Sequence, residues 1–233
     1  MSDNLDSRAL RNTDCYGQRF MKPGTYSYAL VPAGGAGASG DFPYIVEVVE
    51  NASEREGDMH QTTVTVHFVK ERHGDCCDER TADPGRFVPD EVRVTIEAGD
   101  MIVWNSPDAA TRPFAVDGQK DFFGSVALTN ECGYTHVFMT PGEHEYVDAN
   151  GSGLRGVVRV VDPKPRDHDQ LRAWQSRLGE GTLVLVSDGR PEPAEVEIML
   201  GQTVFFAVVK GPGVTITDAS LVADRAEAES GAA

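Results

Sequence analysis

The stretch ALRNTDCYGQRFMKPGTYSY at residues 9–28 recurs without a gap as ALTNECGYTHVFMTPGEHEY at residues 127–146. Nine of the twenty aligned positions are identical, far more than unrelated segments would share. A second repeat relates residues 85–92 to residues 189–196, and two apolar segments separated by a glycine follow each copy. Internal repeats of this kind indicate that the chain contains two similar structural units.

Most apolar segments alternate with a period of two, and β-branched and aromatic residues dominate them. Glycine, proline, aspartate and asparagine separate these segments, as they commonly do between strands. The pattern predicts an all-β fold, with strands at residues 60–69, 91–96, 101–104, 156–161, 182–187 and 202–209.

One segment has the periodicity of a helix instead. Leu171, Trp174 and Leu178 recur every three or four residues, and a glycine follows them as a stop signal. Asp167 and Gln170 have the spacing of a capping box, so the predicted helix begins just after Asp167. We expect this helix to link two β units.

The order of the repeated segments suggests how the two units are built. The segments lie at residues 9–49, 60–105, 125–162 and 181–210; the first resembles the third, and the second resembles the fourth. The middle two are adjacent and predict a contiguous domain, whereas the outer two predict a domain closed from both ends of the chain. Closure within one chain and exchange between chains are both open, and exchange would give self-association. The predicted parts are a contiguous domain at 55–165, a split domain at 9–49 plus 181–220, a helical linker at 166–180 and a polar tail at 221–233.

Three runs in the middle segments carry a family pattern. They are FVPDEVRVTIEAGDMIVWN at residues 87–105, FMTPGEHEY at residues 138–146 and GLRGVVRV at residues 153–160. In order and spacing these runs resemble the cupredoxins, the plastocyanin-like proteins. The resemblance implies two cupredoxin-like Greek-key β-sandwiches, one contiguous and one split.

Cupredoxins hold a blue copper ion with two histidines, one cysteine and usually one methionine. By the resemblance, the corresponding positions of this chain are occupied by Phe114, Asp148, Gly151 and Leu154. All four of the family's ligands are therefore absent. The resemblance implies the fold without the blue copper site, and we expect no cofactor.

These substitutions favour a non-catalytic binding or structural module that has lost its copper site. We expect no catalytic residue, since no Ser/His/Asp arrangement and no phosphate loop marks an enzyme. The alternative is a copper or other metal protein, in electron transfer or metal handling, with displaced ligands at His73, Cys76 and Cys77. These residues combine an imidazole with two thiols but fit no standard zinc spacing. A vicinal thiol or disulfide switch and a solvated loop are the other interpretations of this segment.

Other polar residues receive structural interpretations. His136 lies on the same face of its predicted strand as Phe138, which predicts a core or rim histidine rather than a ligand. Asp148, Asn150 and Arg112 form either a small polar pocket or a set of groups that satisfies loop backbone atoms, and the second interpretation is favoured.

Charge and composition limit the classes of partner and the location that we expect for this protein. The chain has 233 residues, with 37 acidic against 21 basic residues and a net charge of -16, which predicts no nucleic-acid partner. No apolar run approaches the roughly 20 residues of a membrane-spanning helix, so we expect a soluble protein without membrane insertion. The first residues lack the apolar stretch of an export signal, which predicts a cytoplasmic location. Four cysteines are too few for a disulfide scaffold and are expected to be thiols, while a protein partner is possible.

Overall fold

The structure is a computed structural model and describes residues 4–34, 41–51, 59–70, 85–119 and 123–223. Strands dominate these residues, so the predicted all-β fold is confirmed. The strands are β1 (Cys15–Arg19), β2 (Gly24–Pro32), β3 (Tyr44–Val49), β4 (Gln61–Val69), β5 (Arg86–Pro89), β6 (Arg93–Glu97), β7 (Met101–Asn105), β8 (Phe114–Gly118), β9 (Cys132–Val137), β10 (Gly142–Asp148), β11 (Arg155–Val161), β12 (Thr182–Ser187), β13 (Arg190–Glu192), β14 (Glu195–Met199), β15 (Thr203–Lys210) and β16 (Ile216–Asp218).

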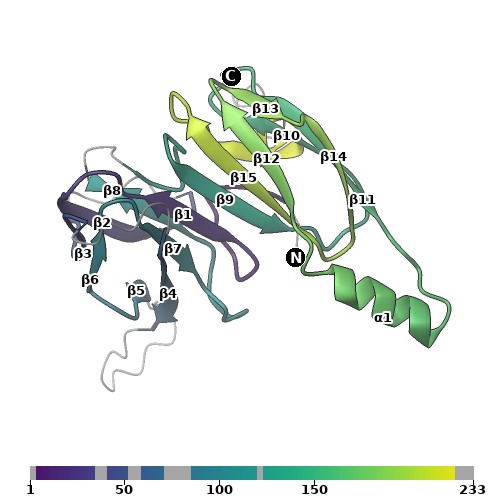
Figure 1. The fold of residues 1–233 in the computed structure, drawn as a ribbon, viewed down its shortest axis with the longest axis horizontal. Coiled ribbons are helices and arrows are strands. Elements are labelled where there is room, and N and C mark those ends of the chain that lie inside the picture. The colour runs from purple at the N-terminus through teal and green to yellow at the C-terminus, as the bar shows by residue number, and fades with distance from the viewer. Residues whose placement is uncertain (1–3, 35–40, 52–58, 71–84, 120–122, 224–233) are drawn as a thin grey trace, which may run out of the picture.

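A large sheet and two smaller sheets form the core (Figure 1). The large sheet has eight strands in the order β13-β12-β15-β9-β1-β7-β4-β5, and the smaller sheets are β6-β3-β2-β8 and β14-β11-β10-β16. Trp104 of β7 meets Tyr28 of β2, with ring centroids 5.4 Å apart, and Phe206 of β15 meets Tyr146 of β10 at 5.0 Å. The register places Trp104 and Phe206 on the same face of the large sheet, so both smaller sheets cover that face and enclose one continuous core.

The predicted division into domains is wrong. Strand β3 pairs in parallel with β6, and β4 with β7, so segment 9–49 is completed by segment 60–105 rather than by 181–220. In the same way β11 pairs with β14 and β12 with β15, so segment 125–162 is completed by segment 181–210. Neighbouring segments combine because the shorter connection costs less conformational entropy on closure. The first half of the chain is therefore β1–β8 and the second half β9–β16, and one chain completes both without exchange of terminal halves.

The predicted helix is confirmed as α1 (His168–Arg177). It connects β11 to β12 within the second half, so it does not link the two halves as a linker between domains would. The side chain of Asp167 caps it by accepting a hydrogen bond from the backbone N–H of Gln170 at 2.8 Å. Trp174 anchors the helix to the second half, because its indole N–H donates to the carbonyl of Leu200 at 3.0 Å. Among the described residues, no helix is both long and apolar enough to cross a membrane.

The two halves are joined through their first strands, β1 and β9, which pair antiparallel at the centre of the large sheet. Tyr16 faces Tyr134, its own counterpart in the repeat. An antiparallel pair in which a residue faces its own counterpart has a two-fold axis between the two residues. The halves are thus related by an internal pseudo-two-fold axis, and Figure 1 shows them on either side of this strand pair.

Each half also sends an N-terminal arm across the axis to the other half. The first arm, residues 5–10, pairs with β16 through a hydrogen bond from Ser7 N–H to the carbonyl of Ile216 at 2.9 Å. The second arm, residues 123–128, pairs with β8 through the equivalent bond from Ser125 N–H to the carbonyl of Val116 at 3.0 Å. The arms therefore cover the inner edges of the two smaller sheets, which would otherwise expose unpaired backbone groups.

The arms reach the central tyrosines by matching contacts. The N–H of Asp6 donates to the hydroxyl of Tyr134 at 3.2 Å, and the N–H of Gly124 donates to the hydroxyl of Tyr16 at 2.9 Å. Asp6 and Gly124 are themselves counterparts in the repeat. Both tyrosines are fully buried, so each hydroxyl obtains its partner from the arm of the opposite half.

The pseudo-symmetry is broken beside these tyrosines. His136 Nδ1 lies 2.7 Å from Asp14 Oδ1, and both side chains are only 1% exposed. The counterparts of this pair across the axis are Gln18 and Cys132, which are also buried but carry no ionisable pair of this kind. Gln18 instead accepts a hydrogen bond from the hydroxyl of Tyr16 at 2.9 Å. The same junction is thus built with an aspartate and a histidine on one side and with a cysteine and a glutamine on the other.

This difference predicts how the junction responds to substitution. We expect Asp14→Ala to lower the free energy of unfolding by about 3 kcal/mol, because it removes a buried carboxylate that lies 2.7 Å from His136 Nδ1 and accepts a hydrogen bond from the N–H of Arg11. The double variant Asp14→Cys, His136→Gln copies the arrangement across the axis and should recover about half of that loss. Urea unfolding of the three proteins at pH 7 measures both values. A double variant as unstable as Asp14→Ala would contradict the proposed equivalence of the two sides.

Candidate functional site

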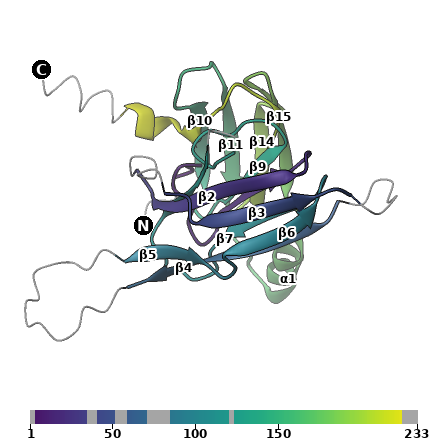
Figure 2. The same ribbon diagram turned by 90° about the vertical axis from the view of Figure 1, so that its left-hand side faces the viewer.

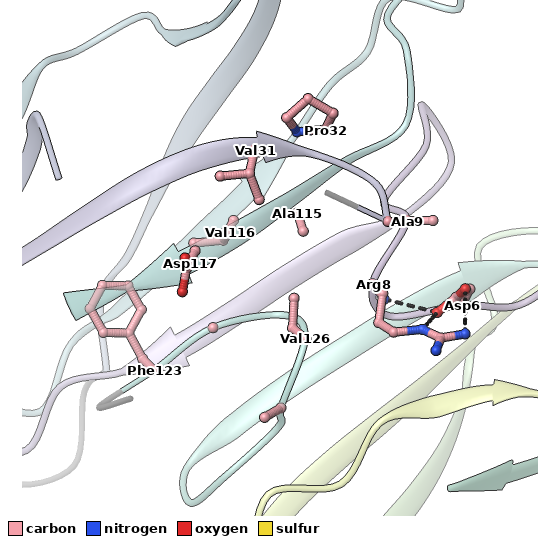
Figure 3. A pocket seen from close by; sticks show the side chains of 13 residues that line it. Asp6, Arg8, Ala9, Val31, Pro32, Ala115, Val116, Asp117, Phe123 and Val126 are labelled. Carbon is pink, nitrogen blue, oxygen red and sulfur yellow. Dashed lines mark hydrogen bonds and ion pairs between the residues drawn. The ribbon is translucent and has the colours of Figure 1, made fainter. Parts of the chain in front are cut away.

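A pocket of about 540 Å³ opens where the two arms meet the small sheet of the first half (Figure 3). Its floor is the outer face of β2 and β8, where Val31 and Ala115 are cross-strand partners. Its walls come from the first arm at Asp6–Ala9 and from the second arm, mainly through Phe123 and Val126. The size lies within the range of small-molecule sites, and both halves of the chain contribute to it.

Most of the lining is apolar, and the polar groups are few. Arg8 forms a two-pronged ion pair with Asp6 on one side of the pocket, with Nε to Oδ1 at 2.9 Å and Nη2 to Oδ2 at 3.1 Å. The side chain of Arg8 is 26% exposed and that of Asp6 is 12% exposed, so the pair is partly shielded from water. Asp117 of β8 adds a half-buried carboxylate. The pocket combines an apolar body with a small number of placed charges.

The corresponding place in the second half is built differently. Ala115 and Pro32 of the pocket have Thr215 and Asn150 as their counterparts. The side-chain amide of Asn150 donates to the hydroxyl of Thr215 at 3.0 Å, so these two side chains are held together. The counterparts in the first half are a methyl group and a proline ring, which cannot form this bond. The side chains at this place therefore differ between the halves: a hydrogen-bonded polar pair in the second half and small apolar groups in the first.

Asp148 completes the polar cluster of the second half. It is buried, and its carboxylate accepts from the backbone N–H of Thr215 at 2.7 Å, of Ser152 at 3.0 Å and of Asn150 at 3.1 Å. Burial by itself raises the pKa of Asp148, but these hydrogen bonds outweigh it and hold the pKa below its usual value of 3.8. The favoured interpretation from the sequence, that Asp148 satisfies loop backbone groups, is confirmed.

The lowered pKa of Asp148 sets a pH dependence. The ionised carboxylate stabilises the fold above pH 3.8, and this contribution is lost as the pH falls through the lower pKa of the folded state. At pH 7, Asp148→Asn should lower the free energy of unfolding by about 1–3 kcal/mol, and the difference from wild type should shrink below pH 3.8. Urea unfolding across this pH range measures it. As a control, Asp162→Asn removes the charge of a carboxylate that accepts a single exposed turn bond from the N–H of Lys164, and it should have a much smaller effect.

The four positions assigned to the former copper site do not come together. Phe114 lies on β8 in the first half, where its ring is 5.7 Å from that of Phe87. Asp148, Gly151 and Leu154 belong to the β10–β11 hairpin of the second half. The side chain of Leu154 is buried in the core. Their grouping with Phe114 is wrong, because it followed from joining the two middle segments into one domain.

Two further interpretations have clear outcomes. His136 is a core histidine as predicted, with its ring 4.7 Å from that of Phe138. Arg112 does not join Asp148 and Asn150, because its guanidinium lies 5.0 Å from the centre of the Phe68 ring in the first half. The predicted cluster of these three side chains is therefore wrong in the case of Arg112.

The cysteines that the structure describes are thiols, as expected. Cys15 and Cys132 are free, and burial raises the pKa of Cys132 to about 12, so it stays protonated at neutral pH. The candidate metal ligands His73, Cys76 and Cys77 lie outside the described residues. Within the described part of the chain, no group of three or more His, Cys, Asp or Glu side chains is placed to hold a metal ion.

Sequence reasoning missed the pocket entirely. Its first-arm residues, such as Asp6 and Arg8, precede the repeat and carry no motif. The signal that could have found it is the difference between Pro32 and Asn150 just beyond the repeat, but its meaning depends on the strand register. No family model matches this chain, and no curated protein or solved structure gives a significant match.

Proposed function

We propose that this protein is a non-catalytic binding module, and that the pocket between its arms holds a small ligand with an apolar body. The observation that carries the proposal is the difference between the halves at equivalent positions. One half carries the bonded pair Asn150 and Thr215 at this place, whereas the other has Pro32 and Ala115 beside an open, mostly apolar pocket. An open, mostly apolar pocket with a few placed polar groups is the usual form of a small-molecule site.

The position of the pocket supports a role in binding. Both arms contribute to it, so a bound ligand would contact the first arm, the second arm and β8 at once. A ligand that binds the folded state alone stabilises that state by an amount that grows with the logarithm of the free ligand concentration above the dissociation constant. The ligand would therefore hold the two halves together in addition to the contacts of β1 and β9.

The relationship to cupredoxins is a separate part of the proposal. We propose that the chain derives from a cupredoxin-like sandwich without the blue copper ligands, on the strength of the runs at residues 87–105 and 138–146. A metal-handling role would depend on His73, Cys76 and Cys77, which lie outside the described residues.

The pocket can be tested with a fluorescent probe. N-phenyl-1-naphthylamine is neutral at pH 7 and gains fluorescence in an apolar site, so titration should give saturable binding to the wild type. Ala115→Leu places a larger side chain in the pocket and should weaken binding at least about tenfold, since the added volume competes directly with the probe. Fluorescence titration measures the dissociation constants.

A matched variant separates filling of the pocket from a change of the strand face. Ser27→Leu adds a leucine to β2, on the same outer face as Val31 but outside the pocket. It should bind the probe as the wild type does. Equal affinity for the wild type and for folded Ala115→Leu would show that the probe binds elsewhere and would overturn the proposal.

A further inference from the structure

We infer that the outer face of the large sheet is an interface, and that its partner is a second copy of this chain. Both smaller sheets lie on the opposite face, as Figure 2 shows for the first half, where β2, β3 and β6 lie in front of β7. In both views α1 lies at the end of the strands, where Trp174 contacts Leu200. Leu183, Leu185 and Val209 on the outer face are 48%, 42% and 49% exposed.

Charged side chains are nearly absent from this face. It is formed by every second residue of five adjacent strands, beginning at Leu183 of β12, Thr203 of β15, Gly133 of β9, Cys15 of β1 and Met101 of β7. Among these described positions only Arg19 is charged at pH 7, although charged residues make up 25% of the chain. Arg19 lies at the end of β1 and forms an ion pair with Glu131 at 3.6 Å. The interior of the face is therefore uncharged.

The outer faces of the smaller sheets show what the same chain places on a sheet surface in contact with water. Arg93 of β6 pairs with Glu47 of β3 at 2.9 Å, and Arg159 of β11 pairs with Glu143 and Glu195 on the two neighbouring strands at 3.0 and 3.3 Å. Such cross-strand ion pairs are typical of solvated sheet faces. The large sheet departs from this pattern, and depletion of charge is characteristic of the core of a protein interface.

The centre of the face has low relief. Gly17 of β1 and Gly133 of β9 are cross-strand partners there and carry no side chain. A Cβ atom at Gly133 would overlap the ring of Phe205, and one at Gly17 would lie 3.3 Å from Met101 Sδ, so these larger side chains lie across the glycines. A broad apolar surface of this shape fits another sheet, since two sheets pack face to face about 10 Å apart.

A second copy supplies a matching surface of sufficient size. Two identical apolar faces complement each other across a two-fold axis, and neither needs charges that the face lacks. β4 extends the face with Thr63 and Thr65, and six strands of about five residues, about 4.8 Å apart, present roughly 500 Å² per copy. Two copies then bury roughly 1,000 Å² or more, which meets the lower limit for a stable interface. The net charge of -16 on each copy stays outside this contact.

Sedimentation velocity of the full chain between about 1 and 100 µM tests the inference. We expect a concentration-dependent dimer. Its association should strengthen between about 50 and 500 mM NaCl, because salt screens the repulsion between two acidic copies and leaves the apolar contact in place. Association that weakens over this range would indicate an interface held by ion pairs and would contradict a contact through the uncharged face.

Leu183→Lys should weaken the dimer at least about tenfold, because the two-fold axis places the new charge in the contact twice. Val209→Lys, at another exposed position of the face, should act in the same direction. Both side chains are about half exposed, so the folding of the variants should be unchanged, which urea unfolding checks.

Val161→Lys is the matched control. Val161 is 44% exposed on β11, on the outer face of a smaller sheet, so the variant gains the same charge outside the proposed contact and should dimerise like the wild type. A wild type that stays monomeric at about 100 µM would overturn the inference. A dimer that is weakened equally by Leu183→Lys and Val161→Lys, or by neither, would also overturn it.

Discussion

The antiparallel pairing of β1 with β9 is the constraint on which the rest of the structure depends. It sets Tyr16 against Tyr134 and so fixes the pseudo-two-fold axis of the chain. Once this register is set, two four-stranded sheets must lie on one face of a single eight-stranded sheet. Their inner edges then approach each other across the axis, and each arm has to fill the space beside the sheet of the opposite half.

The two arms form the walls of the candidate site. Each arm supplies backbone hydrogen bonds to an inner sheet edge and to a buried tyrosine hydroxyl, so its path is determined by the fold. Side chains along that path are less constrained. In the second half, hydrogen bonds connect Thr215 to both Asn150 and Asp148. In the first half, small apolar side chains line the pocket.

The sequence predicts the local structure well and the assembly poorly. Period-two segments and the cap at Asp167 report local preferences, so most strands and α1 were predictable. Four repeated segments in the order 9–49, 60–105, 125–162 and 181–210 can be divided in two ways, and the repeat alone does not distinguish them. In the structure, strands of neighbouring segments pair with each other. Phe114 therefore lies in the first half and Asp148 in the second. The pocket could not be predicted, because one of its walls is the second arm, which comes from the opposite half.

The break in symmetry at Asp14 and His136 has a consequence for how such a molecule can evolve. In a dimer of identical subunits every substitution appears on both sides of the axis, so an acid introduced at one junction is introduced at the other as well. Covalent joining of the two copies removes that coupling. Position 14 can then be aspartate while its counterpart is Cys132, and Ala115 can lie beside a pocket while its counterpart Thr215 forms a hydrogen bond with Asn150. Tandem fusion thus gives this chain freedom to specialise one half while the other preserves the scaffold.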